Sequence, residues 1–333
     1  MSDHSATGSL PNLDNLSREA FGALAESHRR ELHTHCYRMM GSVEDAEEMV
    51  QETFLRAWRR RDSYAGRAPV RSWLYRIATN ACLDVLDKRA RRAVPKTYQP
   101  LASAADPIPG EVNEPVWLEP YPDDLLAADS ASPESTVMRR EHITLAFIVA
   151  LQSLPPRQRA VLILRDVLDW RASEVADLLQ TTVAAVKSAL HRARSTLAEV
   201  EPYPDLPVPE PDLLEAYVRA WETANIPALL RLLTEDATFS MPPIPAWYRG
   251  RDEIAALTGR TIFSGDAAGR WRLLPTRANG QPAFGLYRAS GDGTYSGYGI
   301  QALTLRRDGI ADIITFRKPG LIVAFGLPAA LTD

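Results

Sequence analysis

The hydrophobic and polar positions divide the chain into helical stretches and one mixed stretch. Apolar residues recur every three or four positions through 17–60, 70–90 and 137–200, which predicts amphipathic helices in all three. From 212 onward, two short helical stretches precede segments that alternate apolar and polar residues and meet at glycine turns. The pattern predicts a multidomain chain, with two all-α modules followed by an α+β domain of helices on a curved sheet.

Proline-rich segments separate these parts. Eight prolines fall between 93 and 136, too many for regular structure, and a second proline run is typical of a semi-rigid spacer. The predicted layout is a disordered lead-in at 1–14, a helical module at 15–92, a linker at 93–136, a second helical module at 137–200, a spacer at 201–211 and a C-terminal domain at 212–330.

One island in the linker differs from its surroundings. The segment Pro115–Pro122 places large apolar side chains among prolines, in an otherwise acidic stretch. Such side chains are unfavourable in water, so we expect them to dock on another part of the chain. The residues expected to dock are Trp117, Leu118 and Tyr121.

Length and composition narrow the class of protein. The chain has 333 residues, 45% of them hydrophobic and 24% charged, as in globular proteins of two or three domains. The apolar run Leu321–Leu331 is too short to cross a bilayer, and Met1–Asn12 lacks the features of a secretory signal. Cys36 and Cys82 have no metal-like spacing and are expected to be reduced thiols. We therefore expect a cytoplasmic protein with no membrane contact.

Charge is segregated along the chain, although the net charge is only −4. Residues 56–92 contain eleven Lys and Arg against three acids, whereas 96–134 contain eight acids against one Lys. The basic block suits a polyanion, and the acidic block beside it could compete for the same surface. Solvated helix faces would explain both blocks equally well.

The segment 45–58 forms the first candidate site. On a helix its acidic and amide side chains form a stripe opposite the apolar one. Such a stripe suits docking on basic residues of a partner protein, although an exposed amphipathic helix has the same pattern. The candidate residues are Asp45, Glu48, Gln51 and Glu52.

The next helix, 70–84, combines cationic, aromatic and amide side chains. Phosphates favour Arg and Lys, while unstacked bases favour aromatic faces and amide edges, so this mixture suits single-stranded DNA. Trp73 and Ile77 could equally belong to a helical core, and the loop Asp62–Arg67 is a further candidate for DNA contact. The candidate residues are Arg60, Arg71, Trp73, Tyr75, Arg76 and Asn80.

The second module contains a helix-turn-helix pattern. A short helix at 173–179, a tight turn at 180–182 and a longer helix at 183–200 leave a polar face free for the major groove and its phosphates. His191 has no second ligand nearby, which argues against a metal site. The candidate residues are Thr182, Lys187, Ser188, His191, Arg192 and Arg194.

In this order the segments resemble the sigma-70 family of RNA polymerase sigma factors, extracytoplasmic-function (ECF) group. Segment 45–58 resembles the family's helix that binds core polymerase, and 70–84 its segment that melts the promoter and reads the minus-ten element. The stretch from Leu154 through Arg194 resembles its domain for the minus-thirty-five element. The resemblance implies core RNA polymerase and promoter DNA as partners and requires no cofactor. It leaves the presence of an anti-sigma partner open.

The C-terminal part resembles the SnoaL-like fold, a cone of helices on a bent sheet. The resemblance rests on the segments Ala220–Glu222, Leu232–Phe239, Tyr248–Asp252 and Arg277–Ala283. Fused to sigma modules, it resembles a subgroup in which the tail is thought to regulate the modules in cis. In that case the linker island would dock on the tail or between the modules.

Chemistry in the tail is an alternative. Some members of the SnoaL-like superfamily are isomerases, cyclases or hydrolases that use an Asp or His. All histidines and cysteines precede this domain, which leaves carboxylates such as Asp236, Asp252 and Asp312. We expect no catalysis, and either a small-ligand site or a packed interior. The alternatives are a SnoaL-type isomerase or hydrolase fused to a DNA-targeting module, and a helix-turn-helix repressor that never contacts polymerase.

Overall fold

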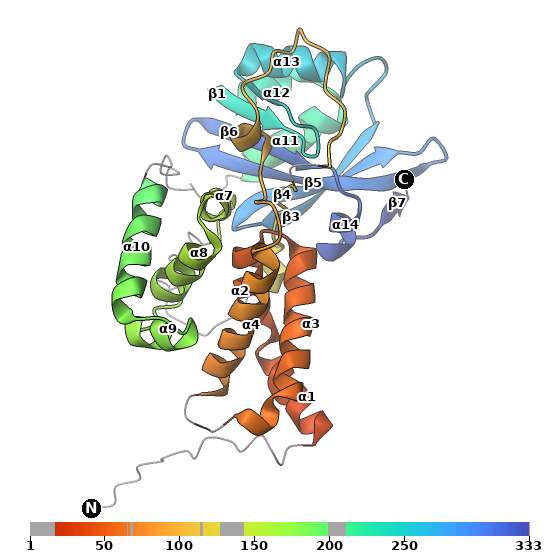
Figure 1. Cartoon of the computed structure of the whole chain (residues 1–333). Coiled ribbons are helices and arrows are strands. Elements are labelled where there is room, and N and C mark those ends of the chain that lie inside the picture. Colours follow the sequence, from red (N-terminus) through yellow and green to blue (C-terminus); the bar gives the residue numbers. More distant parts are fainter. Residues whose placement is uncertain are drawn as a thin grey trace, which may run out of the picture. The chain divides into compact units, whose positions relative to one another are not determined.

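The computed structural model describes residues 17–64, 66, 69–113, 116–126, 143–198 and 211–332. They belong to two compact units (Figure 1). Unit 1 combines the helices before residue 90 with 154–197, and unit 2 combines the linker from 90, the residues leading to 153 and the C-terminal domain. The lead-in 1–14 and the spacer apart from Pro211 lie outside the described residues, as does part of the linker.

The first half of unit 1 is made of α-helices and one 3-10 turn. Its elements are α1 (Arg18–Ser27), α2 (Arg29–Met40), α3 (Val43–Arg59), the 3-10 turn η1 (Arg61–Ser63) and α4 (Val70–Leu86). The Ser42 hydroxyl caps α3 by accepting from the Asp45 N–H, and Gly41 ends α2 at a positive φ of 72°. Leu32, Ala46 and Ala81 are completely buried where the helices meet.

The second half of unit 1 contains the helix-turn-helix. Its elements are α8 (Pro156–Leu162), continued by a π-helical turn η3 (Ile163–Val167), then α9 (Ala172–Leu178) and α10 (Val183–Ala198). Gln180 lies between α9 and α10 with a φ of 51°, which gives the chain its tight turn. Val175, Val186 and Ala193 are buried between the helices. The predicted order of short helix, turn and long helix is confirmed.

Unit 2 contains one sheet. Its strands are β1 (Leu233–Ser240), β2 (Trp247–Arg249), β3 (Trp271–Ala278), β4 (Gln281–Ala289), β5 (Thr294–Arg306), β6 (Gly309–Phe316) and β7 (Ala330–Thr332). They pair in the order β2-β1-β6-β5-β4-β3, with β7 on β5, and only β1 and β6 pair in parallel.

Helices cover this sheet. They are α11 (Pro211–Glu222), α12 (Ile226–Leu232), α13 (Arg251–Arg260) and α14 (Gly320–Ala324). Figure 1 shows α11, α12 and α13 over one face, and the core between them and the sheet includes Trp221, Phe239 and Ile313. The predicted α+β domain is confirmed, and its elements are those of a cone of helices on a bent sheet.

The linker also belongs to unit 2. It forms the short helix α5 (Pro95–Tyr98) and the 3-10 turn η2 (Asp123–Leu125), and α7 (Leu145–Ser153) follows the undescribed residues. By sequence α7 starts the second helical module, but it packs within unit 2. Local sequence could not predict this, because the partners of α7 come from strands more than a hundred residues later in the chain.

Candidate polymerase and promoter interfaces

The acidic stripe expected on α3 is only partly exposed. Glu48 and Gln51 face solvent, and Glu52 is about one-third exposed and paired with Arg56 at 2.7 Å. Asp45 is 8% exposed, and its Oδ1 accepts from Arg89 Nη1 at 2.8 Å. Asp45 therefore holds the end of the basic segment in this structure, while Glu48 and Gln51 remain available to a partner.

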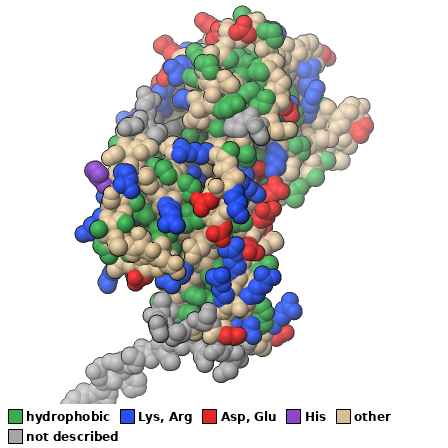
Figure 2. All heavy atoms as spheres, in the orientation of Figure 1, with side chains coloured by type: hydrophobic (Ala, Val, Ile, Leu, Met, Phe, Trp, Pro, Cys, Tyr) green, Lys and Arg blue, Asp and Glu red, His purple; other side chains and the backbone are tan. Residues whose placement is uncertain are grey.

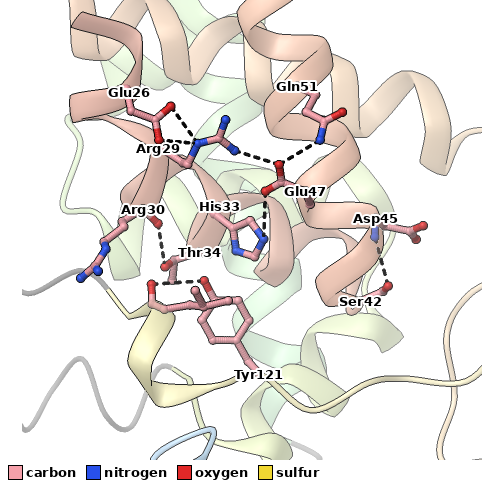
Figure 3. Close-up of polar contacts among 11 residues, drawn as sticks. Glu26, Arg29, Arg30, His33, Thr34, Ser42, Asp45, Glu47, Gln51 and Tyr121 are labelled. Carbon is pink, nitrogen blue, oxygen red and sulfur yellow. Dashed lines mark hydrogen bonds and ion pairs between the residues drawn. The ribbon is translucent and has the colours of Figure 1, made fainter. Parts of the chain in front are cut away.

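Glu47, which sequence reasoning passed over, organises the surface beside Gln51 (Figure 3). Its carboxylate accepts from Arg29 at 2.8 Å and from the Gln51 amide at 2.9 Å, and lies 3.8 Å from His33 Nε2. Burial lowers the pKa of His33 even though Glu47 acts in the opposite direction. Gln51 is thus held at a fixed position on the surface of α3.

Helix α4 carries the residues expected at the minus-ten element, with unequal exposure. Arg71 and Arg76 are exposed, whereas Trp73 and Asn80 are half-buried. Tyr75 is only 1% exposed, with its ring 5.5 Å from that of Trp170. A base cannot reach the Tyr75 ring in this arrangement, because α4 is covered on this side by the helix-turn-helix half of unit 1.

The cations on α4 already have partners. Arg71 Nε donates to Glu31 at 2.6 Å, and its guanidinium lies over the Tyr75 ring. Arg76 Nη2 donates to the Asp177 carbonyl at 3.1 Å. A phosphate would have to replace these contacts. Of the other candidates, Arg60 is exposed, whereas Ala65, Arg67 and Ala68 near the end of the loop lie outside the described residues.

Helix α10 presents the most open polar face. Its candidate residues Thr182, Lys187, Ser188, His191, Arg192 and Arg194 are all exposed. In Figure 2, Lys and Arg side chains are distributed over the part of unit 1 that contains α8, α9 and α10. The buried residues of α10, such as Val186 and Leu190, lie on its opposite face. This is the arrangement that a recognition helix requires.

Two residues of this face have additional roles. The Thr182 hydroxyl accepts from the Ala185 N–H at 3.1 Å and so caps α10. Arg194 makes a bidentate ion pair with Asp166 at 2.7 and 2.9 Å, and these hydrogen bonds raise the pKa of Arg194. Arg194 therefore braces α10 against the end of η3.

In unit 2, the turn between β3 and β4 holds two distant parts of the chain. Asn279 is 1% exposed. Its Oδ1 accepts from the Tyr121 N–H at 2.7 Å, and its own backbone N–H donates to the Tyr121 carbonyl at 2.9 Å. Asn279 Nδ2 also donates to the Ile143 carbonyl at 2.7 Å, and Gln281 accepts from the Leu145 N–H at 3.3 Å. We call Asn279 and Gln281 the clamp.

The linker island lies beside the clamp. Leu118 and Tyr121 are buried and Trp117 is half-buried, with its indole N–H donating to the Val112 carbonyl at 2.8 Å. Glu119 pairs with Lys318 at 2.7 Å. Pro115, at the start of the island, is outside the described residues. The signal for the clamp was present as the dipeptide Asn279-Gly280, which favours a tight hairpin turn, but its partners could not be predicted from it.

The tail carboxylates named from the sequence do not converge. Asp236 is exposed, and its hydrogen bond from Arg306 lowers its pKa. Asp252 is exposed in the first turn of α13. Burial raises the pKa of Asp312, which accepts a hydrogen bond from Thr238. Asp312 precedes the core residue Ile313 on β6, so it points to the other face of the sheet, away from the core under α11–α13.

The described residues contain no cluster of His, Cys, Asp and Glu that could hold a metal ion. In the same part of the chain, no helix combines the length and apolar character needed to span a membrane.

The sequence matches three family models, in the order of the modules. They are Sigma-70 region 2 at residues 24–92, Sigma-70 region 4 at 144–197 and the SnoaL-like domain at 214–325. The chain therefore combines two sigma-70 regions with a SnoaL-like tail.

Similarity to known proteins extends over nearly the whole chain. The chain is 43% identical over 324 residues to the ECF RNA polymerase sigma factor SigG of Mycobacterium tuberculosis, and the match covers 94% of this chain and 85% of that one. It is 30% identical over 241 residues to SigJ of the same organism, covering 69% of each. The chain belongs to the ECF RNA polymerase sigma factor family, which makes it a sigma factor rather than an enzyme.

A solved structure shows the same fold. The crystal structure of M. tuberculosis SigJ superposes with a TM-score of 0.60 at 24% identity, covering 92% of this chain and 99% of that chain. The combination of helical sigma regions with an α+β tail thus occurs in a sigma factor of known structure.

Proposed function

We propose that this sigma factor binds core RNA polymerase through α3 and promoter DNA through α4 and α10, starts transcription in the cytoplasm, and is regulated by its own C-terminal domain. The exposed polar face of α10, on a helix-turn-helix that follows a sigma-70 region 2, is the observation that supports this most directly.

Promoter binding divides between the two DNA-facing helices. Lys187, Ser188 and Arg192 are exposed, which supports their contact with base edges and phosphates in the major groove. On α4, we expect Arg76 and Asn80 to contact a melted strand once the Asp177 carbonyl no longer holds Arg76. Tyr75 would need the same separation, because Trp170 now covers it.

The polymerase and promoter surfaces can be tested separately. Full-length protein carrying Glu48→Ala and Gln51→Ala should lose run-off transcription with core polymerase and still bind isolated upstream promoter DNA. Arg231→Ala, an exposed change on α12, is the matched control and should behave as the unchanged protein. Normal transcription from the double variant would remove α3 from the proposed interface.

The clamp is the proposed route by which the tail regulates the sigma regions. It fixes Tyr121 before the undescribed residues and Ile143 after them, so both ends of this stretch are attached to the tail. Helix α7, which begins the Sigma-70 region 4 match, follows Ile143 directly. Opening the clamp would therefore free the chain between the two sigma regions.

Two substitutions distinguish the contacts of the clamp. Asn279→Gly tolerates the φ of 55° but removes all side-chain bonds, whereas Asn279→Asp keeps an acceptor for Tyr121 and loses the donor to Ile143. If both contacts matter, transcription should change several-fold for Gly and at least as much for Asp, because the Asp variant also sets a buried carboxylate oxygen against the Ile143 carbonyl. Binding to core polymerase should be unaltered. Equal output from both variants and the unchanged protein would contradict regulation through the clamp.

A further inference from the structure

The first turn of α10 is apolar, although most of the exposed face of this helix is polar. Val183, Ala184 and Ala185 are all exposed, and Val183 is 40% exposed. The turn contains no acidic residue, and the first cation of the helix is Lys187. The Thr182 hydroxyl accepts from the Ala185 N–H and so fixes the backbone of this turn. An uncharged apolar surface therefore stands at the start of α10.

The helix-turn-helix covers only part of the apolar row on α10. The buried residues of this helix are Val186, Leu190 and Ala193, which follow one another at intervals of four and three residues. Val183 continues the row by one step toward the start of the helix, but it is 40% exposed where Val186 is 1% exposed. The row thus extends beyond the part that the protein itself covers, and its last side chain is available to a partner.

The position of this side chain limits what it can contact. In helix-turn-helix proteins, residues at the start of the recognition helix contact base edges. The side chains of valine and alanine neither donate nor accept hydrogen bonds, so they cannot bind phosphates or the polar atoms of bases. The apolar group that a base edge presents in the major groove is the 5-methyl group of thymine. An apolar first turn is therefore suited to thymine.

We propose that Val183 contacts the 5-methyl group of a thymine in the upstream promoter element and makes the sigma factor selective for that base. Lys187 and Arg192, further along α10, supply the polar contacts that position the helix. This inference rests on the proposed role of α10 as the recognition helix. It adds a preference for one base, which phosphate contacts alone do not give.

The test uses the full-length protein bound to core polymerase. Its preferred upstream site is selected from duplex DNA that carries a random segment, and the selected duplex is remade with one thymine at a time replaced by deoxyuridine. This replacement removes one methyl group and leaves every hydrogen-bonding atom of the base pair in place. At one thymine, the affinity measured by fluorescence anisotropy should fall about threefold, slightly less than full burial of a methyl group would give.

Three variants assign the methyl group to its contact. Val183→Ala should bind the thymine duplex about threefold more weakly than the unchanged protein, with no further loss for deoxyuridine at that position. Val183→Thr keeps one methyl group and should retain a loss of about twofold with deoxyuridine. Val323→Ala, at a valine that is 64% exposed on α14, is the matched control and should show the same loss as the unchanged protein.

Three results would overturn the inference. The selected duplex has no thymine at which deoxyuridine weakens binding, or every such loss is the same in Val183→Ala and in the unchanged protein. In the third, Val183→Ala weakens binding to core polymerase and leaves the affinity for the thymine duplex unchanged, which would assign this valine to the polymerase interface. If the circular dichroism spectrum of Val183→Ala changes, Val183→Ser takes its place, with the same results expected.

Failure of this inference and failure of the proposed function give different results. A selected duplex that needs Lys187 and Arg192 for binding but is insensitive to deoxyuridine rejects the thymine contact and keeps α10 as the recognition helix. If changing Lys187 and Arg192 to Ala leaves the affinity for the selected duplex unchanged, α10 is not the recognition helix, and both proposals fail.

Discussion

Helix α10 and the β3–β4 turn use polar side chains in opposite ways. On α10, Lys187 and Arg192 face solvent above a buried apolar stripe. In the turn, Asn279 and Gln281 are each 1% exposed, and their side-chain amides form hydrogen bonds to other parts of the chain. Exposed polar groups at a helix-turn-helix indicate an external partner, whereas buried polar groups with complete bonding indicate internal positioning.

The contrast explains why one site could be predicted and the other could not. A groove-facing residue on α10 is recognised from the three- and four-residue period of its own helix. The role of Asn279 depends on Tyr121 and Ile143, which lie 158 and 136 residues away in sequence. Residues that bind an external partner can be predicted from the local sequence pattern, whereas residues that hold the chain together internally can be identified only from the fold.

The largest expected effect concerns α10. Changing Lys187, Arg192 and Arg194 to Ala together should weaken binding to upstream promoter DNA roughly 100-fold at moderate salt, because each lost phosphate contact removes counterion release. The slope of log affinity against log salt should become shallower by about 0.9 per contact. Fluorescence anisotropy at several salt concentrations measures both, and an unchanged circular dichroism spectrum is the control for folding. A normal salt slope would argue against this recognition helix.

The next effect concerns the buried amide of Gln281. Gln281→Ala leaves the Leu145 N–H and the Thr304 hydroxyl without their partner, and an unsatisfied buried group costs about 1–3 kcal/mol. Urea unfolding should report a loss of this size, with DNA affinity unaltered. Gln51→Ala, at an exposed amide on α3, is the matched control and should change stability by less than about 0.5 kcal/mol. Similar losses from both changes would remove the distinction between the two kinds of site.

A third effect concerns a buried titratable group in unit 1. Burial, together with Arg38 and Arg71, lowers the pKa of His35 to about 3. Between about pH 6.5 and 3 the unfolded chain binds a proton that the folded chain does not, so stability falls as pH falls, by about 1.4 kcal/mol per unit. Unfolding midpoints from pH 7 to 5.5 measure the slope. His35→Gln should flatten it, and an identical slope in that variant would assign the dependence to other groups.

The smallest effect concerns an exposed ion pair of the C-terminal domain. Asp236 is 61% exposed on its side chain and pairs with Arg306 across the surface. Asp236→Asn should cost less than about 1 kcal/mol and should leave transcription unchanged. Calorimetry measures the change in stability, and run-off transcription measures the activity. A large loss of transcription would favour the alternative in which this carboxylate has a catalytic role.

Most of the helical fold followed from the sequence, since helix periods and capping residues such as Ser42 are local signals. Tyr75 shows the limit of such signals. Its position between Arg71 and Arg76 favoured DNA contact, but α4 packs against neighbours on more than one side and buries Tyr75 with His35 and Trp170. The prolines of the linker correctly predicted little regular structure in its described part, 93–113 and 116–126. They gave no indication that its backbone bonds would be made to α13 and β2.

The clamp has a consequence for tolerated changes in chain length. Tyr121 and Ile143 are both attached to Asn279, so the distance between these two residues is set by one side chain and not by the number of residues that join them. Adding residues between two fixed points of a chain is cheap, since each doubling of the number costs about 0.6 kcal/mol. Insertions between 127 and 142 should therefore leave α7 in place, which makes this stretch a natural position for a tag or a reporter dye.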